Sequence, residues 1–153
     1  MNDTSKREIR IVFNGKNKSR SSVVMTGARC AGGPCIIPLP ADPTGSGQSY
    51  NCSMLRRWSD PNSWTIGNVT GKVPVENDSV IIPRCWTMIY DVADSTLLTY
   101  LEINGILIFE NNGTVDLTLR SRYIFVRAGQ LIIGNKTNPF LREAKIILYG
   151  DYS

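Results

Sequence analysis

The 153 residues, of which 42% are hydrophobic and 20% are charged, are most simply one globular domain. No apolar run approaches the ~20 residues that a membrane-spanning helix needs, so we expect no transmembrane segment in this chain. The chain has no histidine, which excludes Ser-His-Asp and Cys-His catalytic sites as well as mixed Cys/His zinc sites.

The formal net charge of +4 is concentrated near the N-terminus. Residues 1–29 carry seven Lys or Arg side chains against two carboxylates, a net charge of +5, which leaves −1 for the rest. Such a segment predicts an acidic partner. An anionic polysaccharide or a lipid surface fits better than nucleic acid, because Phe13 is the segment's only aromatic side chain. A solvated leader without a partner is the simpler interpretation of the same charges.

Residues 1–55 are predicted to form a basic, Gly/Pro-rich N-terminal arm that is partly ordered. Apolar alternation predicts a short strand at residues 9–13 and a second at residues 21–25. Between residues 27 and 47, four prolines exclude a helix or a central strand.

Four cysteines without the spacing of a mixed zinc site predict two disulfide bonds. Cys30 and Cys35 flank two glycines that let the chain turn back, so we pair these two with each other. Cys52 then pairs with Cys85 and closes a loop of about 34 residues. The chain-entropy account gives such a bond about 3–4 kcal/mol. A four-cysteine zinc site stays open as the alternative.

Glycosylation signals are unusually frequent, with seven Asn-X-Ser/Thr triplets where chance supplies about two. This excess indicates a secreted or cell-surface protein, although residues 1–6 are polar and predict no signal peptide. The triplets begin at Asn2, Asn17, Asn51, Asn68, Asn77, Asn112 and Asn135. We predict glycans on several of them, and Asn68, Asn112 and Asn135 are the best candidates because each lies in a turn-like stretch. A loop-rich domain without glycans is the simpler alternative.

A tryptophan-rich stretch at residues 58–64 separates the arm from the more regular part of the chain. Trp58 and Trp64 bracket an Asp-Pro-Asn turn signal, in which proline fixes φ and the polar side chains bond the local backbone. We expect the two rings to fold back as a lid over the strand that begins at Val80. Together with Trp86 they are also candidates for stacking on a sugar ring, but capping the first strands is the favoured role.

After this lid, pairs of alternating apolar residues recur about every 22 residues. One series is Val80/Ile82, Leu101/Ile103, Ile124/Val126 and Ile146/Leu148; a second is Leu107/Phe109 and Leu131/Ile133; a third is Leu117/Leu119 and Phe140/Leu141. Three short strands per period are typical of a parallel β-helix, in which each rung buries its inward side chains on its neighbours. We therefore predict an all-β chain with a short parallel β-helix of stacked rungs. The predicted inward side chains are Leu101, Ile103, Leu107, Phe109, Ile124, Val126, Leu131 and Ile133.

The alternative architecture is an antiparallel sandwich. The Asn-Gly pairs at residues 104–105 and 112–113 are strong two-residue hairpin signals. A hairpin would pair residues 101–103 with 106–108, whereas a β-helix pairs them with 124–126. The β-helix is favoured because the spacing persists over three repeats, while the Asn-Gly signal does not recur in the next one.

Several ordered motifs resemble the eight-glycine domain family. They are Trp58-Ser-Asp-Pro-Asn-Ser-Trp64, Asp78-Ser-Val-Ile-Ile-Pro83, Leu101-Glu-Ile-Asn-Gly-Ile-Leu-Ile-Phe109, and Tyr123-Ile-Phe-Val-Arg-Ala-Gly-Gln-Leu-Ile-Ile-Gly134 with Asn138-Pro-Phe140. The resemblance covers residues 56–150 and leaves residues 151–153 as a tail. One departure is that residues 56–150 hold seven glycines rather than eight.

The resemblance implies an extracellular module of a larger secreted or cell-surface protein, like those of fibrocystin-like membrane proteins. Its implied function is non-catalytic interaction or adhesion, with other extracellular domains or carbohydrate as partners. The alternative that it implies is part of a hyaluronan-depolymerising glycosidase. We assign no catalytic residue, since the available carboxylates form no paired motif. They are Asp60, Glu76, Asp78, Asp91, Asp94, Glu102, Glu110 and Asp116. No metal ligand or cofactor is expected, and Ca²⁺ is kept open without a motif to support it.

Overall fold

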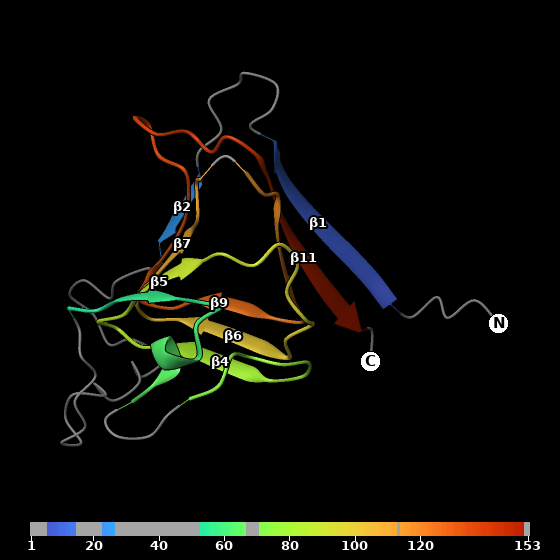
Figure 1. Cartoon of the computed structure of the whole chain (residues 1–153). Helices are drawn as coiled ribbons and strands as arrows, with labels where there is room; N and C mark the ends of the chain where they lie inside the picture. Colours follow the sequence, from blue (N-terminus) through green and yellow to red (C-terminus); the bar gives the residue numbers. More distant parts are fainter. Residues whose placement is uncertain (1–5, 15–22, 27–52, 67–70, 113, 152–153) are drawn as a thin grey trace, which may run out of the picture.

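The computed structural model describes residues 6–14, 23–26, 53–66, 71–112 and 114–151, and these ranges are all-β (Figure 1). One short 3-10 turn, η3 (Pro61–Trp64), interrupts the strands. The strands are β1 (Lys6–Asn14), β2 (Val23–Thr26), β3 (Leu55–Arg57), β4 (Ser79–Ile82), β5 (Thr87–Tyr90), β6 (Tyr100–Ile103), β7 (Ile106–Phe109), β8 (Leu117–Ser121), β9 (Ile124–Val126), β10 (Gln130–Ile133) and β11 (Glu143–Asp151).

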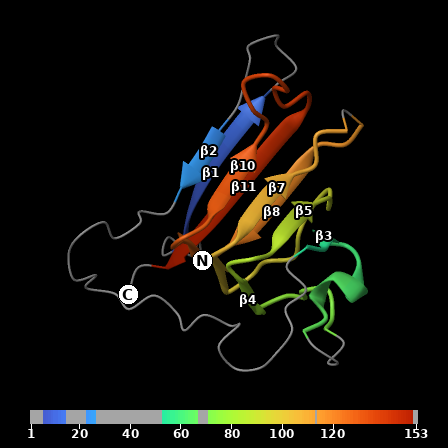
Figure 2. The same cartoon turned by 90° about the vertical axis from the view of Figure 1, so that its left-hand side faces the viewer.

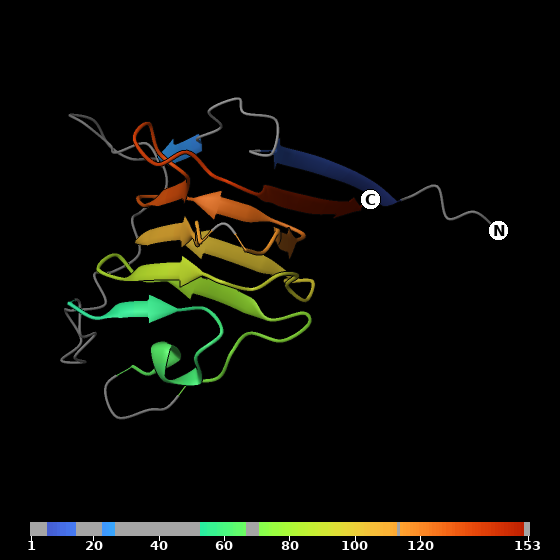
Figure 3. The same ribbon diagram turned by 45° about the horizontal axis from the view of Figure 1, so that its top comes forward.

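The strands form three sheets that lie on three sides of a common core (Figure 1). The first sheet has the order β4-β6-β9, the second β3-β5-β7-β10-β2, and the third β8-β11-β1. Successive strands along the chain move from one sheet to the next, so the chain rises in layers (Figure 3). The all-β class is therefore confirmed. The sheets remain separate, and the closed coil of a complete parallel β-helix is not confirmed.

The register of the first sheet follows the predicted series. Leu101 pairs in parallel with Val80 on one side and with Ile124 on the other, the members before and after it. Residues 101–103 thus lie beside 124–126 and not beside 106–108, so the hairpin alternative is wrong. The second sheet agrees, because Leu131 pairs in parallel with Leu107, its predicted neighbour.

Two further members of the second series are absent from the prediction. Met88 and Tyr90 pair with Leu107 and Phe109 in parallel, which extends the series back into β5. Both side chains are completely buried. Met88 and Tyr90 are closer in sequence to Leu107 and Phe109 than the period of about 22 residues that links the other pairs. The spacing alone therefore does not reveal them.

The predicted third series is wrong in its second member. Leu119 pairs with Ile146 and not with Leu141, so Ile146 belongs to the third sheet and does not continue the series of Ile124. The reason is a longer connection between β10 and β11, which begins at Gly134 with a φ of 63°. Within it Phe140 packs into the core, while Leu141 is 53% exposed.

Six of the eight predicted inward side chains are buried with at most 1% exposure, namely Leu101, Ile103, Leu107, Phe109, Leu131 and Ile133. The other two, Ile124 and Val126, are only half-buried and pack against the edge of the core. They lie on β9, the last strand of the first sheet, where only β6 covers them from the side. Position at the end of the stack therefore sets their exposure.

Two strands of the N-terminal arm join the far end of the stack. β1 pairs antiparallel with β11 along its whole length, and β2 pairs antiparallel with β10 (Figure 2). Both strands overlap the ranges predicted from the sequence, 9–13 and 21–25. In the second and third sheets, an antiparallel strand therefore follows the last parallel one.

Stacked glycines turn the chain between the first and second sheets. The amides of Asn104 and Gly105 both donate to the carbonyl of Ile82 (2.9 and 3.1 Å), and the Gly105 carbonyl accepts from Gln130 N at 2.9 Å. A Cβ atom on Gly129 would lie 2.0 Å from the Gly105 oxygen. Since no Cβ atom approaches an oxygen so closely, this corner requires glycine.

Replacing Gly129 with alanine is expected to lower the free energy of unfolding by about 1–3 kcal/mol, because the methyl group must push two stacked corners apart. Urea unfolding followed by circular dichroism measures the difference. Gln130→Ala, one residue further on, is the matched control and should cost less than about 1 kcal/mol. A Gly129→Ala chain as stable as this control would show that the corner does not need glycine.

Candidate functional site

The predicted tryptophan turn is present at one end of the stack. The Asp60 carboxylate accepts from Asn62 N at 2.9 Å, which fixes the turn around η3. Trp64 Nε1 donates to the Trp58 carbonyl at 2.9 Å, and the two rings meet edge to face with centroids 5.1 Å apart. Trp58 and Trp86 are each only 2% exposed. Their burial favours the predicted capping role over sugar stacking.

Arg56 closes the same end of the core, a role that the sequence does not indicate. Its guanidinium lies 3.7 Å from the ring centre of Trp86, a cation–π contact, and donates to the backbone carbonyls of Ser63 and Thr65. Burial lowers the pKa of Arg56. In the sequence Arg56 is one of two adjacent arginines, and nothing distinguishes it from its exposed neighbour Arg57.

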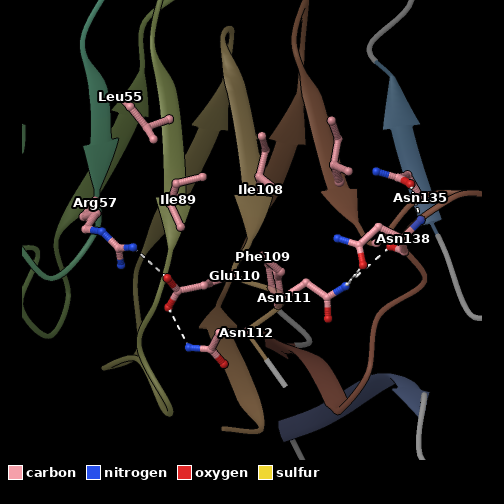
Figure 4. A pocket seen from close by; sticks show the side chains of 12 residues that line it. Leu55, Arg57, Ile89, Ile108, Phe109, Glu110, Asn111, Asn112, Asn135 and Asn138 are labelled. Atoms are coloured by element: carbon pink, nitrogen blue, oxygen red, sulfur yellow. Dashed lines mark hydrogen bonds and ion pairs between the residues drawn. The ribbon is translucent and has the colours of Figure 1, made fainter. Parts of the chain in front are cut away.

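A hollow of about 370 Å³ opens on the outer face of the second sheet (Figure 4). Its floor is a row of outward isoleucines that face each other across neighbouring parallel strands, Ile89, Ile108 and Ile132. Each is half-buried and lies between two buried members of an inward pair. On a solvated sheet face, outward positions such as these are expected to be polar. The apolar residue at each of them is the signal by which the sequence could have located the hollow.

Polar side chains line the edge of the hollow where β7 and β10 end (Figure 4). Arg57 bridges Glu110 at 2.7 Å and Asp91 at 3.1 Å, and Asn112 Nδ2 donates to Glu110 at 3.1 Å. The hydrogen bonds to Glu110 and then Asp91 raise the pKa of Arg57. The cation is therefore compensated by two carboxylates, and Glu110 is held by two donors.

The two loops that form this edge are fastened to each other. Asn111 Nδ2 donates to Asn138 Oδ1 (3.1 Å) and to the Pro139 carbonyl (2.9 Å), and Asn111 Oδ1 accepts from Leu141 N at 2.9 Å. These bonds engage both ends of the Asn111 amide with one loop. Asn138 itself is an exposed residue of this edge (Figure 4). The edge is thus a fixed array of side-chain amides.

A second polar cluster lies on the outer face of the first sheet. The buried Glu102 carboxylate accepts from Tyr100 Oη (2.7 Å), Asn104 Nδ2 (2.8 Å) and Arg127 (3.3 Å). Burial acts to raise the pKa of Glu102, but these three hydrogen bonds outweigh it and hold the pKa below its ordinary value. Burial, followed by the bond to Glu102, raises the pKa of Tyr100 to about 12. The cluster ties β6 to β9.

The charged form of Glu102 is expected to stabilise the fold above its unfolded-state pKa of about 4.3. Its folded-state pKa is lowered, so this stabilisation is lost as the pH falls through that lower value. Urea unfolding of the unaltered chain and of Glu102→Gln at pH 7 and pH 3 tests this, and the advantage of the unaltered chain should shrink at pH 3. Glu76→Gln, at an exposed carboxylate, is the control. An advantage that is equal at both pH values would contradict the prediction.

Residues 63–153 match the G8 domain, the eight-glycine domain that the sequence resembles. The chain belongs to this family. Fibrocystin of Mus musculus is 33% identical over 103 residues and that of Canis lupus familiaris 31% over 104, each covering 67% of this chain. Fibrocystin-L of Homo sapiens is 30% identical over 105 residues, 63% of the chain. The chain spans about 2% of the length of each relative. No solved structure matches it significantly.

The matched part of this G8 domain contains the floor strands β5, β7 and β10 and the amide edge of the hollow. Of the predicted glycosylation sites, Asn112 and Asn135 both lie on that edge. Asn77 lies elsewhere, in the turn before β4, with a φ of 65°. The remaining predicted sites, Asn2, Asn17, Asn51 and Asn68, lie outside the described residues.

The cysteines of the G8 domain are described only in part. Cys85, shortly after β4, is disulfide-bonded. Cys30, Cys35 and Cys52 lie outside the described residues, so both predicted pairings stay predictions. Among the residues that the structure covers, no group of three or more Cys, Asp or Glu is arranged to hold a metal ion. The same residues include no helix with the length and apolarity to cross a membrane.

Proposed function

We propose that this G8 domain is a non-catalytic extracellular module of a larger, fibrocystin-like surface protein. In this proposal it forms the first rungs of a parallel β-helix and binds a neutral saccharide in the hollow of the second sheet. Family membership and the fibrocystin relatives support the extracellular setting. The excess of Asn-X-Ser/Thr triplets supports it independently.

The β-helix part of the proposal is supported by parallel register in all three sheets. From β4 to β11, each parallel strand pairs with the strand that occupies the same place in the next rung. The tryptophan turn and Arg56 cover one end of this stack with aromatic and guanidinium groups. A covered first rung is what a β-helix needs where it begins, because an open rung would expose its inward side chains.

The hollow carries the binding part of the proposal. Its isoleucine floor offers an apolar surface for the C–H faces of a sugar ring, and its edge offers several side-chain amides. Each amide both donates and accepts hydrogen bonds, as sugar hydroxyls require. Arg57 is the one cationic residue among those that line the hollow, and Glu110 and Asp91 compensate it. A neutral, hydroxyl-rich saccharide therefore fits this hollow better than an anionic one.

A hyaluronan-depolymerising site finds less support in this hollow. A paired-carboxylate mechanism needs a second Asp or Glu at about 5–9.5 Å from the first. Among the residues that line the hollow, Glu110 is the one carboxylate, and Arg57 and Asn112 hold it. The nearby Asp91 does not line the hollow, and its carboxylate is paired with the same Arg57.

A saccharide array probed with the full chain, made without N-glycans in an oxidising host, tests the proposal. Ile108→Lys places a charged chain on the floor and is expected to abolish binding. Ile81→Lys, at an outward isoleucine of the first sheet that is 55% exposed, is the matched control and should bind normally. Binding of a neutral saccharide should also change little between low and high salt.

Failure to bind any neutral saccharide, or equal losses in the two lysine variants, would contradict the binding part of the proposal. Steady shortening of hyaluronan during incubation with the chain would instead support the depolymerase alternative. Retention of the chain on an anionic polysaccharide, lost at high salt, would assign binding to its basic residues and not to the hollow.

A further inference from the structure

The two sequons of this hollow follow neighbouring parallel strands of successive rungs. Asn112 follows the end of β7, and Asn135 follows the end of β10, the strand that lies beside it in parallel. Both asparagines line the hollow. Asn112 and Asn135 are both exposed, as are the hydroxyl residues that complete the two sequons, Thr114 and Thr137.

The two asparagines are also held in the same local geometry. Asn112 Oδ1 accepts from the amide (3.0 Å) and the hydroxyl (2.8 Å) of Thr114. Asn135 Oδ1 accepts from the amide (3.0 Å) and the hydroxyl (2.9 Å) of Thr137. In each case the loop engages the oxygen of the carboxamide, and a glycan would be carried by the other end of the group, the nitrogen.

Neither nitrogen is blocked by its present contacts. Asn112 Nδ2 donates to Glu110 at 3.1 Å, and a glycosylated amide keeps one N–H that can still make this bond. Asn135 uses its oxygen for Thr137 and Asn138, which leaves its nitrogen on the exposed edge (Figure 4). Both nitrogens can therefore bear a bulky, hydrated group without disturbing the fold.

We infer that N-glycans on Asn112 and Asn135 cover the isoleucine floor, so that occupancy of these two sequons controls access to the hollow. This inference rests on the proposed function for its biological meaning, but the covering itself does not require a ligand. A glycan on Asn77 has no such effect, because Asn77 lies in the turn before β4 and does not line the hollow.

Glycopeptide mass spectrometry of the full chain from a secretory host measures occupancy, and we expect glycans on both Asn112 and Asn135. Access is measured by the rate at which Ile108→Cys reacts with a maleimide reagent, before and after enzymatic removal of glycans. Removal is expected to raise this rate by about tenfold, since thiol reactivity follows exposure. Ile132→Cys, on the same floor, is the second probe in case the first variant does not fold.

Two controls separate covering from other effects of the glycans. Ile81→Cys, outside the hollow, should react at nearly the same rate with and without glycans. Ser79→Ala, which removes the Asn77 sequon, should leave the rate at Ile108→Cys unchanged, whereas Thr114→Val with Thr137→Val should raise it.

Unoccupied sequons at both positions, or equal maleimide rates before and after glycan removal at both floor cysteines, would overturn the inference. These readouts use no saccharide ligand. Failure of the array experiment therefore leaves them interpretable, and a covered floor that binds no saccharide after glycan removal would overturn the proposed function alone.

Discussion

Trp86→Ala is expected to lower the free energy of unfolding by about 3–5 kcal/mol, the cost of a large buried ring replaced by a methyl group. The ring is 2% exposed and lies edge to face with Trp64, with centroids 6.2 Å apart. The guanidinium of Arg56 lies 3.7 Å from its centre. Removing the ring thus opens a cavity and also leaves a buried charge without its aromatic partner.

Unfolding of the chain by the denaturant guanidinium chloride, followed by far-UV circular dichroism, measures this loss of stability without relying on tryptophan fluorescence. Tyr123→Ala is the matched control, since Tyr123 is a large aromatic residue that is 56% exposed beside the first sheet. It should cost less than about 1 kcal/mol. A Trp86→Ala chain that loses no more than this control would mean that the Trp86 ring does not close this end of the core.

Ile103→Ala is expected to cost about 2–5 kcal/mol, because its completely buried side chain lies in the central strand of the first sheet. Ile82 faces it from β4 and Val126 from β9, so neither neighbouring strand can collapse into the space without losing register. Ile81→Ala makes the same change one strand away, on an outward side chain, and should cost less than about 0.5 kcal/mol. Similar costs for the two variants would contradict the inward assignment of Ile103.

The alternating pairs that recur at about 22 residues were enough to predict the parallel register of the first sheet and one pairing of the second, that of β7 with β10. This works because a strand has a side-chain period of two, so a pair such as Leu101/Ile103 can face the core only together. The number of residues in a rung then determines which apolar pair of the next rung lies beside Leu101/Ile103. The tryptophan turn was equally local, since Asp60, Pro61 and Asn62 act on the backbone beside them.

The assignment of Ile146 to the third sheet depended on the length of the connection after β10. A loop can lengthen by several residues without changing the apolar pattern, so the period alone could not show that Leu119, and not Ile124, faces Ile146. The half-exposure of Ile124 and Val126 likewise depends on where the stack ends. The periodicity of the strands predicts neither the length of this loop nor the rung at which the stack ends.

Some features of the candidate site could likewise be predicted from the sequence, and others depended on the tertiary structure. The sequence identified Asn112 and Asn135 as glycosylation signals, because the triplet is local and its chemistry depends on neighbouring residues. Their meeting at one hollow was decided by the parallel pairing of β7 with β10, which brings residues of successive rungs to the same edge. Arg56 shows the converse, since two adjacent arginines have the same local chemistry. Alternation along β3 buries one against Trp86 and leaves the other at the surface with Glu110.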